Sequence, residues 1–237
     1  MNCDIVFTHP DNVLFPIWMN WINDHRKEFN RILVSIHKKH IDGWDFTPEI
    51  KTWAKTCDVD IFEPEVNHSI DWRNLSVNHC LDNSSSEWIL FLEGDFFVKN
   101  IEKFFKDIEL HIPHHKIAGN AQGTRLHPSF LLVDREIINK TSRDFSPIET
   151  DHFGKFSREI LKEVGDYYDL DMLHNGSWFH MNGLTQNYTL VQLGEKPNHD
   201  IPSFMLYNIT SLDLKYPRYN ELCHLAEQSL TGLGAFI

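Results

Sequence analysis

The sequence predicts an α/β protein built around a mainly parallel β-sheet, and three observations support this prediction. The first 95 residues alternate strand-like and helix-like segments three times and then finish on a fourth strand. Such alternation is typical of parallel sheets with right-handed crossovers. Residues 88–92 (Trp-Ile-Leu-Phe-Leu) form an unbroken apolar run, as expected of a strand buried on both faces. Of the 237 residues, 41% are hydrophobic and 24% are charged, which indicates a globular core rather than disorder.

The N-terminal part follows a regular strand–helix order. Pro10 ends the first strand, because proline cannot donate a hydrogen bond within a sheet. The apolar positions 17, 18, 21 and 22 have helical spacing. Thr47 and Pro48 are typical of a helix start, and Asp71 is the expected N-cap of a later helix. The expected elements are a strand at 3–7, a helix at 15–29, a strand at 31–36, a helix at 47–56, a strand at 59–62 and a helix at 72–81.

The order changes after residue 98, and no internal repeat, low-complexity segment or clear linker divides the chain. We therefore expect a single domain over residues 1–237. Three histidines surround Pro113 in a stretch that we expect to be an exposed loop. The expected elements are a helix at 101–108, a strand at 129–133, a helix at 134–140, a helix at 151–164, an irregular aromatic stretch at 178–183 and a strand at 188–193.

Composition excludes several classes of function. The chain has 22 basic and 34 acidic residues and a formal net charge of −12, which argues against nucleic acid as a partner. Cys3, Cys57, Cys80 and Cys223 form no C-x-x-C pair, so zinc-finger and thioredoxin interpretations fail, and free thiols in a reducing compartment are expected. We see no signal peptide and no transmembrane segment, and we expect a soluble cytoplasmic protein, either free or peripheral at a membrane.

Two carboxylates follow the central apolar run, at Glu93 and Asp95, with Gly94 between them. In open α/β sheets, ligands bind outside the carboxyl ends of the strands. Two acids in that place can hold Mg²⁺ or Mn²⁺, which prefer oxygen ligands and phosphate co-ligands. The alternative is a polar turn that only ends the strand.

The order of these segments resembles that of the GT-A nucleotide-sugar glycosyltransferases, especially the family-2-like group. Residues 71–81 with the serines at 84–86 are similar to its nucleotide-binding helix and following loop, and Glu93-Gly-Asp95 is similar to its D-x-D metal motif. Glu149-Thr-Asp151-His-Phe-Gly resembles the region of its catalytic acid. The resemblance covers residues 3–165. It implies a GT-A (Rossmann-like, nucleotide-diphospho-sugar transferase) fold with a central mainly parallel mixed sheet flanked by helices.

This resemblance implies a metal-dependent enzyme that moves a sugar from a nucleotide-diphosphate donor to an acceptor hydroxyl, with inversion. Residues 1–98 would then bind the nucleotide-sugar and residues 99–237 the acceptor, which would be a glycan, a lipid-linked or a protein-linked group. Mn²⁺ or Mg²⁺ would be held by Asp95 and Glu93 and by a C-terminal histidine. His199 is the first candidate by sequence order, and His180 is its rival.

The resemblance also assigns a general base and donor contacts. Asp151 matches the position of the base that an inverting transfer needs, although an acid at a helix start is common without any catalytic role. Asp71, Arg73 and Asn78, together with Glu93, are the candidate contacts to the nucleotide, although a helix cap, a solvated arginine and a helix-face asparagine are ordinary alternatives.

The sequence departs from the family in three places. Glu93 stands where the family usually has aspartate, the Q-x-x-R-W motif of processive members is missing, and residues 8–12 do not follow the P-x-x-N pattern. Two other functions stay open. One is a non-catalytic nucleotide- or carbohydrate-binding module on the same fold. The other is a nucleotidyltransferase, which would need a glycine-rich basic loop after the first strand, where this chain has Thr-His-Pro-Asp-Asn.

Overall fold

The structure is a computed structural model of the whole chain. It describes residues 1–8, 25–35, 58–62, 70–93, 96–98, 101–122, 124–146, 153–170 and 178–180, together with residues 52, 55 and 148. The predicted helix at 15–29 and the predicted strand at 188–193 therefore lie wholly or mostly outside the described residues.

Nine strands and four α-helices are described in these ranges. The strands are β1 (Cys3–Thr8), β2 (Ile32–Ser35), β3 (Asp60–Phe62), β4 (Trp88–Leu92), β5 (Phe96–Val98), β6 (Ile117–Gln122), β7 (Arg125–Asp134), β8 (Tyr168–Asp169) and β9 (Trp178–His180). The helices are α3 (Ile70–Asn83), α4 (Ile101–Glu109), α5 (Arg135–Ile138) and α6 (Gly154–Val164), and a short 3-10 turn spans Arg26–Glu28.

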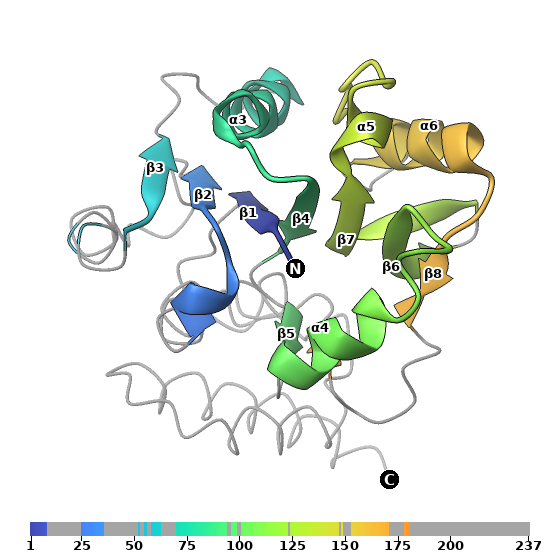
Figure 1. Cartoon of the computed structure of the whole chain (residues 1–237). Coiled ribbons are helices and arrows are strands. Elements are labelled where there is room, and N and C mark those ends of the chain that lie inside the picture. Colours follow the sequence, from blue (N-terminus) through green and yellow to red (C-terminus); the bar gives the residue numbers. More distant parts are fainter. Residues whose placement is uncertain are drawn as a thin grey trace, which may run out of the picture.

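Seven strands form the central sheet in the order β3-β2-β1-β4-β7-β6-β8 (Figure 1). The pairs β3–β2, β2–β1, β1–β4 and β6–β8 are parallel, whereas β7 runs antiparallel to both β4 and β6. The sheet is therefore mixed and mainly parallel, which confirms the predicted fold class. A second sheet pairs β5 with β9.

Two edges of the central sheet recur below. The carboxyl edge is where β1, β2, β3 and β4 end and the antiparallel β7 begins at Arg125. The amino edge is the opposite one, where those four strands begin and β7 ends at Asp134. Each crossover helix that follows a parallel strand starts on the carboxyl side and returns to the amino side, so α3 begins near the first edge and ends near the second.

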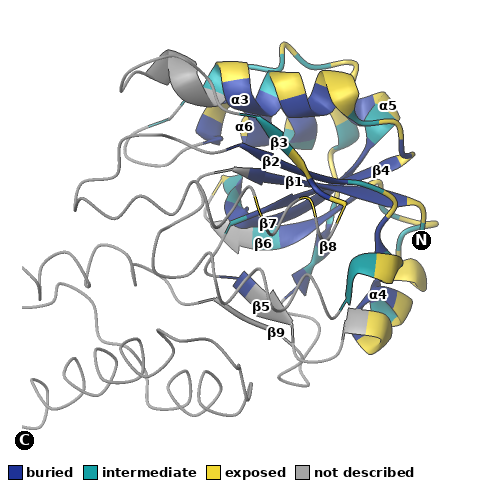
Figure 2. Ribbon diagram, turned by 90° about the vertical axis from the view of Figure 1, so that its left-hand side faces the viewer, coloured by how far each residue is buried: buried dark blue, intermediate teal, exposed yellow. Residues whose placement is uncertain are grey.

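Helices cover the sheet on both faces (Figure 1). Figure 2 shows α3, α5 and α6 on one face, and α4 with the β5–β9 pair on the other. The side chains divide in the same way into two buried clusters. One cluster packs β-strand residues against Phe104, Phe105 and Ile108 of α4, and the other packs them against α3, α5 and α6.

The central strand β4 is buried along its whole length, as the apolar run predicts. It lies between β1 and β7, with Cys3 opposite Trp88 and Phe130 opposite Leu92. Its alternate side chains enter the two clusters, Leu90 on the α4 side and Phe91 on the α6 side. The acids that follow this strand therefore leave the sheet from its middle.

Several boundaries differ from the predictions. The helix predicted from residue 72 begins at Ile70, so Asp71 lies inside its first turn and is not its N-cap. The helix predicted from 151 begins at Gly154, because Phe153 has a left-handed φ of 64° and cannot continue a helix backwards. The helix predicted at 134–140 spans Arg135–Ile138, and Asp134 is its N-cap, since its carboxylate accepts a hydrogen bond from Glu136 N.

Four strands were missed by pattern reading, and the first of them, β5, has three residues only. Strand β6 has the sequence Ile-Ala-Gly-Asn-Ala-Gln, whose small residues have low strand preference. It forms because β7 offers a long partner, and β7 itself begins at Arg125, four residues before the predicted start. Strand β8 has two residues only. The stretch at 178–183 was predicted to be irregular, which is wrong for 178–180, because these residues form β9.

Candidate functional site

The carboxyl edge brings together the ends of β1, β2, β3 and β4, at Thr8, Ser35, Phe62 and Leu92. The chain order reverses there, since β1 has β2 on one side and β4 on the other. Ligands of open α/β sheets bind at such a switch point, outside the carboxyl ends. This edge is therefore the candidate site, and it is the edge at which Glu93 follows β4.

Glu93 is fixed at this edge by backbone hydrogen bonds. Its N–H donates to the carbonyl oxygen of Ser129 on β7, at 3.1 Å, which extends the β4–β7 pairing by one residue. Its carbonyl oxygen accepts from Phe96 N at 3.3 Å, which closes the turn between β4 and β5. Asp95, the candidate metal ligand, lies outside the described residues. The described residues on either side of it, Glu93 and Phe96, are thus held by backbone hydrogen bonds.

The strand after this turn pairs with β9, in a register that places Phe96 opposite His180. The pairing joins the acid motif to a segment more than eighty positions later in the chain. It places the backbone of His180 opposite the residue that follows Asp95. His199, the other candidate histidine, lies outside the described residues. The register therefore places the backbone of His180 beside β5, which begins one residue after Asp95.

The predicted donor-binding residues lie on α3. Asp71 and Arg73 are in its first two turns, at the carboxyl edge, and their side chains are outside the description. The side-chain amide of Asn78 donates to the carbonyl oxygen of Asn74 at 2.9 Å and to that of Arg143 at 3.2 Å. Both N–H groups of the Asn78 amide therefore donate to backbone carbonyl oxygens. A nucleotide contact by Asn78 stays a prediction.

Asp151, the candidate base, also lies outside the described residues, but the chain on either side of it is described. Ile148 accepts a hydrogen bond from Arg125 at the start of β7, at 3.1 Å. Phe153 donates its N–H to Phe145 O at 3.4 Å. The short connection that carries Asp151 therefore leaves from and returns to the carboxyl side of the molecule.

Sequence reasoning missed the polar side chains that β7 brings to this edge. His127 accepts a hydrogen bond from Ser129 N through Nδ1, at 3.1 Å, which leaves the proton of a neutral ring on Nε2. The hydroxyls of Ser35, Ser76 and Ser129 are fully buried and have no hydrogen-bond partner among the described residues. No motif identifies these residues, because a single serine or histidine in a strand or a helix carries no pattern.

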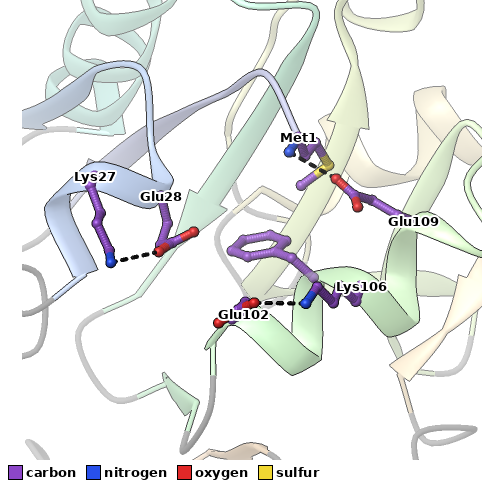
Figure 3. Close-up of a pocket in the computed structure, with 7 residues that line it drawn as sticks. Met1, Lys27, Glu28, Glu102, Lys106 and Glu109 are labelled. Atoms are coloured by element: carbon purple, nitrogen blue, oxygen red, sulfur yellow. Dashed lines mark hydrogen bonds and ion pairs between the residues drawn. The ribbon is translucent and has the colours of Figure 1, made fainter.

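A cavity of about 490 Å³ lies elsewhere, between the start of the chain, the turn at Arg26–Glu28 and α4 (Figure 3). Its charged groups are paired with one another. The N-terminal amine lies 2.8 Å from Glu109, Lys106 lies 2.7 Å from Glu102, and Lys27 lies 3.9 Å from Glu28. The cavity therefore offers no unbalanced positive charge to a diphosphate.

No three histidine, cysteine or acidic side chains gather at metal-binding distance within the described part of the chain. This finding does not test the predicted set of metal ligands, because two of its members, Asp95 and His199, are not in that part. Carboxylate oxygens are nevertheless the donors that Mg²⁺ and Mn²⁺ prefer, so the chemistry of the two acids fits such an ion. Among the described helices, none has the length and apolar character that crossing a membrane requires.

Comparison with known proteins identifies solved structures that share this fold. No protein-family profile matches the chain, and no curated protein matches its sequence. Solved structures match along its whole length. Residues 1–349 of S. aureus TarS match with a TM-score of 0.55 and 12% identity, over 100% of this chain and 72% of that one. The mannosyltransferase PcManGT from Pyrobaculum calidifontis, in complex with GDP-Man and Mn²⁺, matches with a TM-score of 0.54 and 12% identity, over 99% and 74%. TarS has also been solved with UDP-GlcNAc. The chain therefore has the GT-A glycosyltransferase fold that its sequence predicts.

Proposed function

We propose that this protein is a metal-dependent GT-A glycosyltransferase that moves a sugar from a nucleotide-diphosphate donor to an acceptor hydroxyl, with inversion. The observation that carries the proposal is the position of the acid motif. It follows the central buried strand at the switch point of the sheet, in a fold that solved nucleotide-sugar-binding proteins share. Glycans and lipid-linked or protein-linked groups are the candidate acceptors.

In this proposal Asp95 and Glu93 hold a divalent ion, Mn²⁺ or Mg²⁺, with one histidine completing the set. The ion neutralises the charge that develops on the leaving diphosphate. The anchoring of Glu93 to Ser129 and Phe96 supports a fixed position for this motif. The pairing of β9 with β5 supports His180 as the third ligand, and His199 stays the other candidate. Asp71 and Arg73 would contact the nucleotide from the first turns of α3.

Asp151 would accept the proton of the acceptor hydroxyl as it attacks the anomeric carbon. A general base has to lie within hydrogen-bond reach of that hydroxyl. The described contacts of Ile148 and Phe153 keep both ends of its connection at the carboxyl side, where the acid motif also lies. The predicted division into a donor half, 1–98, and an acceptor half, 99–237, belongs to the same proposal.

A thermal-shift panel tests the donor and metal together. UDP-, GDP- and CMP-linked sugars would be added with Mn²⁺, Mg²⁺ or EDTA to the wild type, to Asp95→Ala and to Glu102→Ala. A ligand at roughly 100 times its Kd adds about 2.7 kcal/mol of stability. For a chain of this length that raises Tm by about 5–10 °C. Glu102 is the matched control, because it is an exposed carboxylate whose partner is Lys106 on α4.

We expect a metal-dependent shift with one class of nucleotide, retained in Glu102→Ala and lost in Asp95→Ala. No shift with any donor, from a protein that melts cooperatively, would overturn the metal site. Binding without any release of nucleoside diphosphate in the presence of acceptors would instead favour a non-catalytic binding module.

A further inference from the structure

One face of α3 holds the segment that leads toward Asp151. Asn74, Asn78 and Asp82 are spaced by four residues, so they lie on one side of the helix. Asp82 accepts a hydrogen bond from the Arg143 guanidinium at 2.8 Å, and Asn78 donates to Arg143 O at 3.2 Å. These contacts hold the beginning of the segment near the C-terminal end of α3.

Asn74 holds the next part of the segment, one helical turn closer to the carboxyl edge. Its Oδ1 accepts from Phe145 N at 2.7 Å, and its Nδ2 donates to the Ser146 hydroxyl at 3.1 Å. The same amide side chain therefore binds two successive residues. The segment runs along α3 from the amino edge toward the carboxyl edge.

Arg125, which lies on β7, holds the same segment that Asn74 holds from α3. It is the first residue of β7, and its guanidinium donates to Ile148 O at 3.1 Å. The contact links two stretches that lie 23 residues apart, at a partly buried position. Because β7 also pairs with Glu93 through Ser129, the strand that anchors the acid motif also anchors Ile148.

The far end of the connection is held just as closely. A Cβ added to Gly154 would lie 2.8 Å from the backbone nitrogen and from the Cβ of Ile148, so only glycine allows this approach. Phe153 keeps its left-handed φ of 64°, a conformation that costs a non-glycine residue about 1 kcal/mol or more. Its ring is buried, in edge contact with Phe91 and Phe145, which stabilises the unusual backbone.

Four residues separate Ile148 from Phe153, and Asp151 is one of them. We propose that Asn74 and Arg125 are positioning residues for Asp151, which they hold through Ile148 and the segment before it. This inference rests on the proposed function, in which Asp151 is the general base. Small displacements of a reacting group are costly, since about 1 Å can reduce a rate roughly 100-fold.

The arrangement also couples the two halves of the reaction. Asp71 and Arg73, the candidate donor contacts, lie on the same helix as Asn74. In this proposal, one helix, α3, both contacts the donor and holds the segment that leads to the base. This gives a physical reason for the amide at position 74, which the sequence pattern did not single out.

The experiment compares Arg125→Gln, Arg125→Lys and Asn74→Ala with Arg135→Gln as matched control. Arg135 also donates to a backbone carbonyl and to a serine hydroxyl, Ser86 O and Ser84 Oγ, but at the amino edge. UDP-GlcNAc and GDP-mannose with Mn²⁺ are the probes. Binding is measured by calorimetry, and kcat and KM by release of the nucleoside diphosphate to water or to an added acceptor.

We expect Arg125→Gln and Asn74→Ala to lower kcat by about 10- to 100-fold while the donor Kd changes by less than about 3-fold. Arg125→Lys should recover most of kcat, because an ammonium group can still donate to Ile148 O. Arg135→Gln should lower Tm and leave kcat unchanged. Equal loss of kcat in Arg135→Gln, or no loss in Arg125→Gln, would overturn the positioning role.

Amide hydrogen exchange tests, without any measurement of activity, whether Asn74 and Arg125 hold this segment in place. In Arg125→Gln and Asn74→Ala, peptides that span residues 146–156 should exchange faster than in the wild type, whereas Arg135→Gln should leave them unchanged. Unchanged exchange in the first two variants would overturn the inference. A wild type that binds no probe would overturn the proposed function alone, because the exchange result would still stand.

Discussion

The two edges of the central sheet differ in how many hydrogen-bond partners their buried polar side chains have among the described residues. At the amino edge, the carboxylate of Asp4 is fully buried and accepts five hydrogen bonds, all from described residues (Asn30 Nδ2, Arg31 N, Ser85 N, Ser86 N and Ser86 Oγ). At the carboxyl edge, the buried hydroxyls of Ser35 and Ser129 have no partner among the described residues. Within the described ranges, the first edge satisfies its buried carboxylate, whereas the second has two buried hydroxyls without a partner.

This contrast has a physical reason. Every buried polar group that is left without a partner costs about 1–3 kcal/mol, so proteins satisfy such groups unless another requirement intervenes. Asp4 ties the starts of β1, β2 and β4 to one another with a single charged group. The carboxyl edge carries the candidate site, and two buried hydroxyls there, those of Ser35 and Ser129, have no partner among the described residues. The predictions below test this difference.

The largest expected effect is at Asp4. Asp4→Ala should lower the free energy of unfolding by about 3–5 kcal/mol, because it leaves several buried donors without an acceptor. Urea denaturation followed by circular dichroism measures the change. Asp4→Asn, which keeps one acceptor oxygen, should lose less. A loss below about 1 kcal/mol for Asp4→Ala would mean that the amino edge is not the stabilising one.

The same substitution at both edges gives the next effect. Ser86→Ala removes a hydroxyl that donates to Asp4 at 2.6 Å and accepts from Asn30 at 3.0 Å, and it should cost about 1–3 kcal/mol. Ser35→Ala and Ser129→Ala should be neutral or stabilise the protein by up to about 1 kcal/mol, since each removes a buried hydroxyl that has no partner in the described part of the chain. Equal losses at all three serines in urea denaturation would remove the distinction between the edges.

Acid should weaken the carboxyl side through Asp144. Hydrogen bonds from Ser146 and then Lys155 lower the pKa of Asp144 to about 2, from an ordinary 3.8. A depressed pKa stabilises the fold above the ordinary value, and this contribution is lost as pH falls from about 4 to about 2. Because the Asp144 carboxylate is 33% exposed, solvent screening limits the contribution to roughly 1 kcal/mol. Asp144→Asn should flatten the stability profile over this range, whereas an unchanged profile would contradict the ion pair.

The smallest expected signal comes from the buried thiols. Burial raises the pKa of Cys80 to about 12, and burial followed by the charge of Asp4 raises that of Cys3. With Cys57 and Cys223 replaced by serine, the folded protein should therefore resist thiol-labelling reagents at pH 8 until it unfolds. Rapid labelling of Cys3 in the native protein would show that the amino edge opens easily.

The sequence predicted the elements that have strong local signals. Residues 88–92 form β4 at the predicted positions, because an uninterrupted apolar run has few alternatives in a folded protein. The ends of the N-terminal strands and of α3 were predicted to within two residues, since capping and periodicity leave the ends loosely determined. The acid motif was identified as a candidate site because its residues are contiguous.

Elements without a local signal depended on a partner. The residues of β6 do not favour a strand by themselves and form one against β7, and β9 forms against β5. For the same reason, the sequence did not predict that the amide of Asn78 donates to the backbone of Asn74 and Arg143, and a nucleotide contact by Asn78 stays a prediction. No sequence pattern predicts which distant segment of the chain packs against a given face of a helix.

The sequence by itself determined the α/β class, the buried central strand and the place of Glu93 and Asp95 after it, because hydrophobic periodicity and chain order carry that information. Only the tertiary structure decided that His180 lies opposite Phe96, that Asp4 gathers the amino edge, and that Asn74 and Arg125 hold the segment before Asp151. These contacts join residues far apart in the chain. Their partners are selected by the packing of the sheet and its helices, which no local pattern encodes.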